Sequence, residues 1–278
     1  MSLKNQQQQI HEIRSIVLEQ YEKHPELYDS IDIEWIQNDD WPIEECIRSD
    51  KLFNNFKILN DGLLFRKQQR LPRLIETDFP AELFRIGFVH GNGKDYDGNE
   101  LLFIRVKCYY KIRLREQIFR NFILFQMERC LHRSHGHGIT MIVDFNGFSY
   151  ANIDLDFIIW GAKLLTKFCP KSLKRIVCYD MSRIVIPFYN IFKRLLSDEI
   201  QQRLRFWNDD EIFKYIDRNN LPRYLGGTCH HYRNVPTECQ SIIDYGHDHD
   251  WSDNDIGHIL KLIKPNLDES EMFECSKE

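Results

Sequence analysis

The stretch Ile139-Thr140-Met141-Ile142-Val143-Asp144-Phe145-Asn146-Gly147 is an apolar run that ends in turn residues, the pattern typical of a buried strand. A second apolar strand follows at Arg175-Ile176-Val177-Cys178-Tyr179-Asp180-Met181. Directly after it comes a very apolar helical segment, residues 183–196. Further on, Leu221-Pro222-Arg223-Tyr224-Leu225-Gly226-Gly227-Thr228 has the form of a strand exit closed by two glycines. This order of strands and helix decides the fold class.

Strand-like and helix-like segments alternate through the middle of the chain. In order, they are a strand at 101–106, a helix at 113–132, a strand at 139–145, a helix at 153–168, a strand at 175–181, a helix at 183–196, a strand at 204–207 and a helix opened by Asn208-Asp209. Such alternation predicts an α/β domain with a mixed, mostly parallel sheet and helices packed on it.

The chain on either side of this region has a different texture. Residues 10–69 carry apolar residues at three- and four-residue spacing, interrupted at Pro25 and at Asn38-Asp39-Asp40-Trp41-Pro42, which predicts a small all-helical module. Beyond Thr228 the sequence becomes polar and rich in His and Asp, which predicts weak order. We therefore expect a helical module at residues 1–75, the α/β domain at 76–231 and an acidic, weakly ordered tail at 232–278.

The composition predicts a soluble globular protein. Apolar residues make up 42% of the 278 residues, enough for a substantial core, and no apolar run approaches the roughly 20 residues of a membrane-spanning helix. Residues 1–9 are polar and Gln-rich, so no secretory signal is expected. The eight cysteines include no C-x-x-C pair, which favours reduced thiols. These observations predict a cytoplasmic location.

Charge is unevenly distributed along the chain. Residues 238–278 carry a net charge of −8, and the net charge of −5 for the whole chain then leaves +3 for residues 1–237. This positive balance is too small to indicate a nucleic-acid-binding protein. It is compatible with transient binding to an anionic membrane surface, and equally with ordinary solvated faces.

No local motif anchors nucleotide, hydrolase or dinucleotide chemistry. Gly91-Asn92-Gly93-Lys94 could form a phosphate loop, but a second turn and a strand follow it instead of a helix, so a hairpin turn is the favoured interpretation. The sequence contains neither a Gly-x-Ser-x-Gly elbow nor a Gly-x-Gly-x-x-Gly segment after a strand.

Candidate metal ligands and acids are present without a recognisable spacing. The histidines and cysteines concerned are His132, His135, His137, Cys229, His230, His231, Cys239, His247 and His249. Their spacings match no structural zinc pattern, so exposed loop histidines are favoured and no metal or cofactor is expected. Asp144 has no partner acid or histidine nearby in sequence, which favours a structural carboxylate that caps the Asn146-Gly147 turn. No catalytic residue is predicted.

The helical segment 183–196 is apolar around most of its circumference. The apolar positions are Ile184, Val185, Ile186, Phe188, Ile191, Phe192, Leu195 and Leu196. An ordinary surface helix shows a much narrower stripe, so this helix is either buried all round or faces lipid. Pro187 in its first turn and Lys193-Arg194 at its end suit a mobile helix that lies on a bilayer.

From about residue 10 to residue 230, the chain resembles the CRAL-TRIO lipid-binding family. The strings that carry the resemblance are Asn38-Asp39-Asp40-Trp41, Leu64-Phe65-Arg66-Lys67, Ile142-Val143-Asp144 with Gly147, and Leu221-Pro222 with Gly226-Gly227. Further strings, such as Asp97-Gly98-Asn99-Glu100-Leu101 and Ile104-Arg105-Val106-Lys107, are most similar to the branch in which this domain precedes a motile sperm domain. The resemblance implies a helical module followed by an α/β pocket under a mobile apolar helix.

The function that the resemblance implies is non-catalytic. It is the binding, and the transfer between membranes, of a phospholipid or another hydrophobic small molecule in an enclosed apolar pocket. The alternative is a ligand-free protein-interaction scaffold with a filled core. For the pocket we expect a cavity of roughly 300 Å³ or more. Its expected lining is Phe145, Phe157, Trp160, Leu164, Tyr179, Ile184, Phe188, Ile191, Phe192 and Leu195.

Two departures from the family concern the lipid headgroup. In yeast-type phosphatidylinositol-transfer members, a Glu and a Lys pair to hold the inositol, and the corresponding positions here are Lys171 and Arg203. Two cations cannot form that pair, so a cationic mouth without a counter-acid is expected. The hydroxyl residues that bind choline lipids correspond to Ile139 and Met141, which lack hydroxyl groups.

The acidic end of the chain offers one more candidate interaction. Residues 267–278 resemble a degenerate form of the two-phenylalanines-in-an-acidic-tract motif, in which Phe273 would be the anchor. Endoplasmic-reticulum receptors of the major-sperm-protein fold bind such peptides through a basic groove. Met272 and Lys277 depart from the motif, so a plain solvated tail is the favoured alternative.

Overall fold

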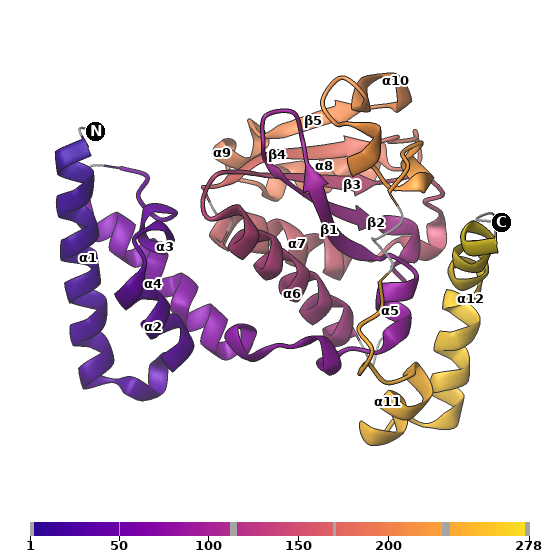
Figure 1. Cartoon of the computed structure of the whole chain (residues 1–278), viewed down its shortest axis with the longest axis horizontal. Coiled ribbons are helices and arrows are strands. Elements are labelled where there is room, and N and C mark those ends of the chain that lie inside the picture. Colours follow the sequence, from indigo (N-terminus) through magenta and orange to yellow (C-terminus); the bar gives the residue numbers. More distant parts are fainter. Residues whose placement is uncertain (1–2, 50, 112–115, 169–170, 230–233, 276–278) are drawn as a thin grey trace.

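The computed structural model describes residues 3–49, 51–111, 116–168, 171–229 and 234–275. A five-stranded sheet with strand order β1-β2-β3-β4-β5 lies at its centre (Figure 1). The strands are β1 (Val89–Lys94), β2 (Glu100–Arg105), β3 (Ile139–Asp144), β4 (Leu173–Tyr179) and β5 (Leu204–Trp207). β1 pairs antiparallel with β2, whereas the pairs β2/β3, β3/β4 and β4/β5 are parallel. The predicted mixed, mostly parallel α/β fold is confirmed.

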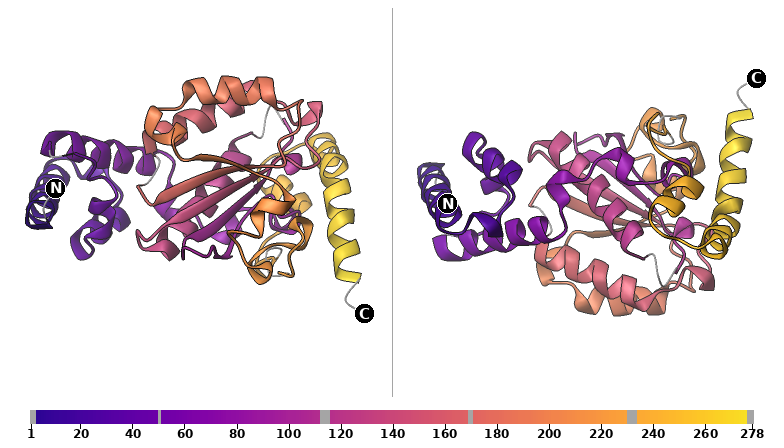
Figure 2. Two further views of the ribbon diagram at one scale, coloured as in Figure 1. Left: turned by 90° about the horizontal axis from the view of Figure 1, so that it is seen from above. Right: turned by 90° about the horizontal axis from the view of Figure 1, so that it is seen from below.

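Both faces of the sheet are covered, which explains why its central strands are continuous apolar runs. One face is packed by α6 (Glu116–Ser134), α7 (Leu155–Phe168) and α8 (Ile186–Leu195). The other is packed by the segment that contains α10 (Asp209–Ile212), η6 (Arg218–Asn220) and η7 (Arg223–Leu225). Figure 2 shows the sheet between these layers. Because successive strand residues point to opposite faces, Met141 contributes to the first core and Ile142 to the second.

The N-terminal helices pack around a hydrophobic core of their own. They are α1 (Leu3–Lys23), η1 (Pro25–Leu27), α2 (Ser30–Asn38), α3 (Trp41–Glu44) and α4 (Leu52–Gln68). Isoleucines and leucines at helical spacing fill this core, including Ile10, Ile13, Ile36 and Leu63. Asp29 caps α2 by accepting a hydrogen bond from the Ile31 N–H. Through η2 (Leu71–Arg73), η3 (Glu76–Asp78) and α5 (Ala81–Arg85) the chain then reaches β1.

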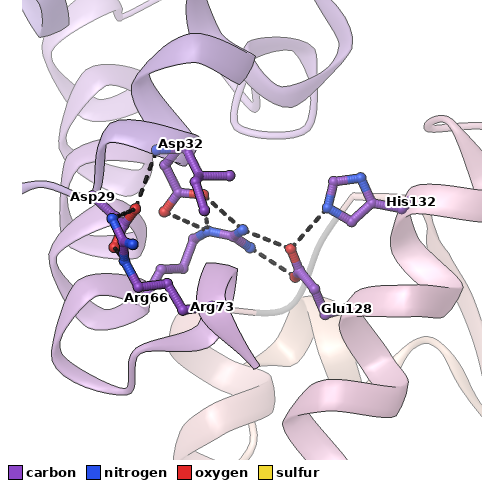
Figure 3. Close-up of polar contacts among 7 residues, drawn as sticks. Asp29, Asp32, Arg66, Arg73, Glu128 and His132 are labelled. Atoms are coloured by element: carbon purple, nitrogen blue, oxygen red, sulfur yellow. Dashed lines mark hydrogen bonds and ion pairs between the residues drawn. The ribbon is translucent and has the colours of Figure 1, made fainter. Parts of the chain in front are cut away.

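An arginine that is mostly buried joins these helices to the α/β domain (Figure 3). Arg66 of α4 donates hydrogen bonds to Asp32 of α2 at 2.8 Å and to Glu128 of α6 at 2.6 Å. His132, one turn further along α6, lies 2.9 Å from the same carboxylate oxygen of Glu128. Burial raises the pKa of Glu128, but Arg66 and His132 outweigh it and hold that pKa at about 2. The carboxylate therefore stays charged at neutral pH and binds the guanidinium firmly.

The C-terminal region folds onto the α/β domain, so the prediction of a weakly ordered tail is wrong. It forms α11 (Ile242–Asp248) and α12 (Asp253–Cys275), which lies along the edge of the domain (Figure 1). Ile256, Ile259 and Ile263 of α12 are buried in the main core. They recur at helical spacing, but the polar and acidic residues on either side of the stretch 256–263 conceal this amphipathic pattern in the sequence. Glu269 also pairs with the buried Arg105 at 3.2 Å.

Two predicted turns take other forms. His90-Gly91-Asn92-Gly93 lies in β1, and the chain reverses at 95–99, where the Asp95 carboxylate accepts hydrogen bonds from two following N–H groups. The region predicted as a strand exit is a 3-10 turn with a single bridge from Pro222 to Cys229. Gly227 is required there, since a Cβ on it would lie 2.0 Å from the Leu221 carbonyl oxygen. Because residues 91–94 belong to a strand and no helix follows them, they do not have the geometry of a phosphate loop.

Asp144 ends β3 on the face opposite α6, α7 and α8. Its carboxylate accepts a hydrogen bond from the Asn146 N–H at 2.9 Å, the turn-capping contact that the sequence predicts. Its neighbour in register is Arg105 of β2. Burial raises the pKa of Asp144 to about 6, although Arg105 and Lys107 act in the opposite direction.

We predict that Arg66→Ala destabilises the folded protein by about 3 to 5 kcal/mol, because it leaves two buried carboxylates without their counter-charge. Urea unfolding followed by circular dichroism measures this loss. Lys23→Ala is the control, since it removes an exposed ion pair with Glu19 on α1. A loss for Arg66→Ala no larger than that for Lys23→Ala would show that Arg66 does not hold the two parts together.

We predict that Asp144→Asn becomes progressively more stable than the wild type as pH rises from about 4 to about 7. The folded protein keeps the Asp144 proton up to a pKa of about 6, whereas the unfolded chain releases it near its ordinary value, so this group's stabilising contribution is lost across that window. The expected change is on the order of 3 kcal/mol. Urea unfolding at several pH values measures it.

Asp61→Asn, at an exposed position of α4, controls for the loss of one negative charge. A difference between Asp144→Asn and the wild type that stays constant across this pH range would contradict a raised pKa at Asp144.

Candidate functional site

A cavity of about 190 Å³ lies between the sheet and the helices α6, α7 and α8. We call it the α8 cavity. Strand side chains of one face form its floor, and the helices contribute mostly aromatic and aliphatic walls. The residues that define it include Ile104, Val106, Ile123, Met127, Met141, Val143, Phe145, Phe148, Phe157, Trp160, Gly161, Leu164, Ile176, Cys178, Phe188, Tyr189 and Phe192.

The alternation of side chains along the strands and a glycine in α7 together create this cavity. Met141, Ile176 and Cys178 occupy alternate positions on β3 and β4, so their side chains share the face that carries the cavity. Gly161 lies in the middle of α7, and a Cβ at this position would meet no heavy atom within 4 Å. The absence of a side chain at Gly161 therefore leaves part of the cavity empty.

The helix α8 forms the outer wall, with apolar side chains on both of its sides. Phe188 and Phe192 are half-buried and line the cavity. Ile186, Ile191 and Leu195 are 42, 39 and 41% exposed. The helix is shorter than predicted because it begins at Ile186, where Pro187 can occupy its first turn. It contains no fully buried residue, so it is not a core helix.

Polar groups at the edge of the α8 cavity bind one another. Asp154 accepts hydrogen bonds from the Tyr109 hydroxyl at 2.8 Å and from the Lys111 ammonium at 3.1 Å. Burial raises the pKa of Asp154, but these two bonds outweigh it and the pKa is lowered. Asn152 donates to the backbone carbonyls of Lys107 and Tyr109. These contacts hold the cavity wall in place. The rest of the lining is mostly apolar.

The structure brings together six of the predicted lining residues. Phe145, Phe157, Trp160, Leu164, Phe188 and Phe192 surround the cavity. Ile191 and Leu195 lie on the exposed side of α8, and Ile184 precedes the helix and is not part of the lining. The sequence interpretation missed Met127, Met141 and Cys178. Alternation along β3 and β4 was the available signal for the last two.

The prediction that Tyr179 lines the cavity is wrong. Tyr179 belongs to the core on the opposite face, where its hydroxyl donates a hydrogen bond to Asp209. Its neighbour Cys178 faces the cavity instead. A shift of one residue along a strand moves a side chain to the other face, so the phase of the alternation decides which of the two lines the cavity.

The predicted cationic mouth without a counter-acid is also wrong. Arg203 pairs at 2.6 Å with Glu199 of α9 (Asp198–Gln201), and Glu199 in turn pairs with Arg48 at 2.8 Å. Arg203 also donates to the backbone carbonyl of Leu173. Lys171 is exposed, and neither it nor Arg203 is among the residues that line the α8 cavity. Arg203 therefore anchors α9 beside β4.

Among the described residues, no group of three His, Cys, Asp or Glu side chains could hold a metal ion. His230 and His231 lie outside the described residues. His132 packs against Trp35 at 4.6 Å between ring centroids, and His247 lies 3.0 Å from Asp253. Within the described part of the chain, no helix is both long and apolar enough to cross a bilayer.

Two comparisons with known proteins agree with this arrangement. Residues 85–227 match the CRAL/TRIO domain model, a range that contains the whole sheet and α6, α7 and α8. The crystal structure of Sfh5 has the same fold, with a TM-score of 0.59 at 13% sequence identity over 90% of this chain and 96% of that chain. The match to the domain model spans more than half of the sequence, so this chain belongs to the CRAL/TRIO domain family.

Proposed function

We propose that this protein binds the apolar part of a lipid, or another hydrophobic small molecule, in the α8 cavity and exchanges it at a membrane surface. Membership of the CRAL/TRIO family points to a lipid or small hydrophobic ligand. The observation that carries the proposal is the mostly apolar lining of the α8 cavity, closed by a helix with apolar side chains on both sides. Burial of apolar surface then supplies the binding free energy, at about 25 cal/mol per Å².

Exchange requires α8 to move. At about 190 Å³ the cavity is smaller than the roughly 300 Å³ that we expect from the sequence and that ligand pockets commonly reach, so a complete lipid needs more space. α8 is the wall most easily displaced, because it has no fully buried residue. It packs mainly on α7, and the Thr166 hydroxyl donates a hydrogen bond of 3.3 Å to the Leu195 carbonyl near its end.

The outer side of α8 is suited to a bilayer. Ile186, Ile191 and Leu195 present apolar surface, and Lys193 and Arg194 add two positive charges at the C-terminal end. Amphipathic helices with this combination lie at membrane interfaces. A bilayer can cover the exposed apolar side chains while α8 swings away from the cavity, so the membrane itself would favour the open state.

This role involves no chemical reaction. The CRAL/TRIO family generally binds ligands, and the polar groups beside the α8 cavity bind one another as described above. The competing function is that of a scaffold that uses the same fold without a ligand. The cytoplasmic location and peripheral membrane association belong to the proposal, and the free thiols of Cys46, Cys108, Cys130, Cys178, Cys229 and Cys239 support a reducing compartment.

Two narrower relationships extend the proposal. We further propose a relationship to the N-terminal domain of motile sperm domain-containing protein 2, which rests on strings such as Ile153-Asp154-Leu155-Asp156-Phe157 and Lys174-Arg175-Ile176-Val177. Binding of an endoplasmic-reticulum receptor through Phe273 stays a prediction. Residue 273 lies within the range of α12, and its side chain is outside the described residues.

We predict that Gly161→Leu abolishes the recovery of bound lipid from the purified protein. The new side chain would occupy the empty part of the α8 cavity, and replacing a helical glycine removes a destabilising residue, so the variant should fold. Native mass spectrometry of wild type and variant, followed by organic extraction, measures the bound ligand. A wild type that carries no lipid and takes none up from vesicles would favour the scaffold.

We predict that Lys193→Glu combined with Arg194→Glu weakens binding to phosphatidylserine-containing vesicles at low salt by at least about thirtyfold. Each basic residue at a membrane surface contributes about 1 kcal/mol, and the two added negative charges act in the same direction. Vesicle co-sedimentation measures the change. The control is Lys261→Glu combined with Lys264→Glu, the same charge reversal at exposed positions of α12. Equal losses in the two variants would mean that α8 is not the docking element.

A further inference from the structure

A second cavity of about 150 Å³ lies between the helical module and the α/β domain. We call it the α4 cavity. One side is formed by α3 and α4, and the other by α6, α7 and the sheet. Its apolar lining includes Ile36, Ile58, Leu59, Gly62, Leu63, Leu71, Leu102, Leu124, Leu131, Ile139 and Leu173. Nothing in the proposed function assigns a role to this space.

The α4 cavity adjoins the α8 cavity through a shared wall of three side chains. Met127 of α6, Met141 of β3 and Leu164 of α7 line both spaces. Two of the three are methionines, whose unbranched side chains change rotamer easily and fill irregular gaps. The side chains of Met127 and Met141 are therefore the most adaptable part of the wall between the cavities.

We propose that the two cavities form one ligand site with two lobes, in which the α4 cavity holds the distal end of a long, linear hydrocarbon chain. This inference rests on the proposed function, because the ligand would enter through the α8 cavity. A ligand longer than the α8 cavity can hold would displace the two methionine side chains and continue toward α4. Short ligands would stay in the α8 cavity.

The polar side chains around the α4 cavity determine the chemistry of the ligand's end. Arg66 is bound to Asp32 and Glu128, and Glu45 accepts a hydrogen bond of 2.7 Å from the Ser172 N–H. A polar group at the end of the ligand would have to compete for these buried partners, which is unfavourable. The distal end is therefore a plain alkyl chain, and the polar head of the ligand remains on the side of α8.

A glycine in each lobe permits a matched pair of substitutions. Gly62 of α4 lines the α4 cavity and Gly161 of α7 lines the α8 cavity, and an added Cβ at either position meets no heavy atom within 4 Å. Leucine at Gly62 would fill the far lobe alone. Gly257 of α12 also has open space around it but is exposed, so Gly257→Leu is the control for a leucine on a helix.

The test measures the binding of decanol and octadecanol to the full chain by native mass spectrometry over a concentration series. Gly62→Leu should weaken octadecanol binding by more than about tenfold and leave decanol unchanged, since each methylene kept out of apolar surroundings weakens binding about fourfold. Gly161→Leu should weaken the binding of both alcohols. Gly257→Leu should match the wild type.

Three outcomes would overturn the inference. Octadecanol binding to Gly62→Leu that stays within about twofold of the wild type would exclude the far lobe. Equal weakening of both alcohols would show that the lobes are not separate sites for short and long chains. A wild type that binds neither alcohol would remove the proposed function as well. Ile58→Phe, one turn away on the same side of α4, repeats the test if Gly62→Leu does not fold.

Discussion

The rest of the structure depends on the burial of both faces of one sheet. Most residues of the central strands β2 and β3 enter one of two cores, because successive side chains point to opposite faces and both faces are covered. Met141 and Val143 of β3 contribute to the floor of the α8 cavity, whereas Ile142 and Asp144 point to the opposite side. The apolar run of β3 therefore contributes both to the floor of the α8 cavity and to a second core.

A buried ion pair determines how the helical module meets this sheet. The guanidinium of Arg66 extends from α4 to α6, and its positive charge needs negatively charged partners there, because an unpaired buried charge is strongly unfavourable. Asp32 and Glu128 both supply that compensation, and the planar guanidinium holds the two carboxylates in a fixed orientation. The network lies beside the α4 cavity, of which Arg66 and Glu128 are part of the lining. The module thus has a structural reason to stay in place while α8 moves.

Two helices of the structure, α12 and α8, differ in how tightly they are held. α12 buries three isoleucines in the main core and places Glu269 against Arg105 and Lys107. α8 buries no residue completely and leaves Ile186, Ile191 and Leu195 exposed. Local stability follows buried apolar contact, so α8 is the element most ready to leave the sheet. The exchange of a ligand that we propose at α8 therefore need not disturb the rest of the domain.

The sequence by itself determined the alternation of strands and helices, the family resemblance and the local caps. These features depend on neighbouring residues, such as Asn208, whose side chain accepts hydrogen bonds from the first N–H groups of α10. Only the tertiary structure decided that Cys178 faces the cavity instead of Tyr179, because the phase of a strand is set by pairing with its neighbours. It also decided that Glu199 binds Arg48, which is 151 positions away in the chain, and that α12 packs on the core. Contacts between residues distant in the chain leave no local pattern that could be read in advance.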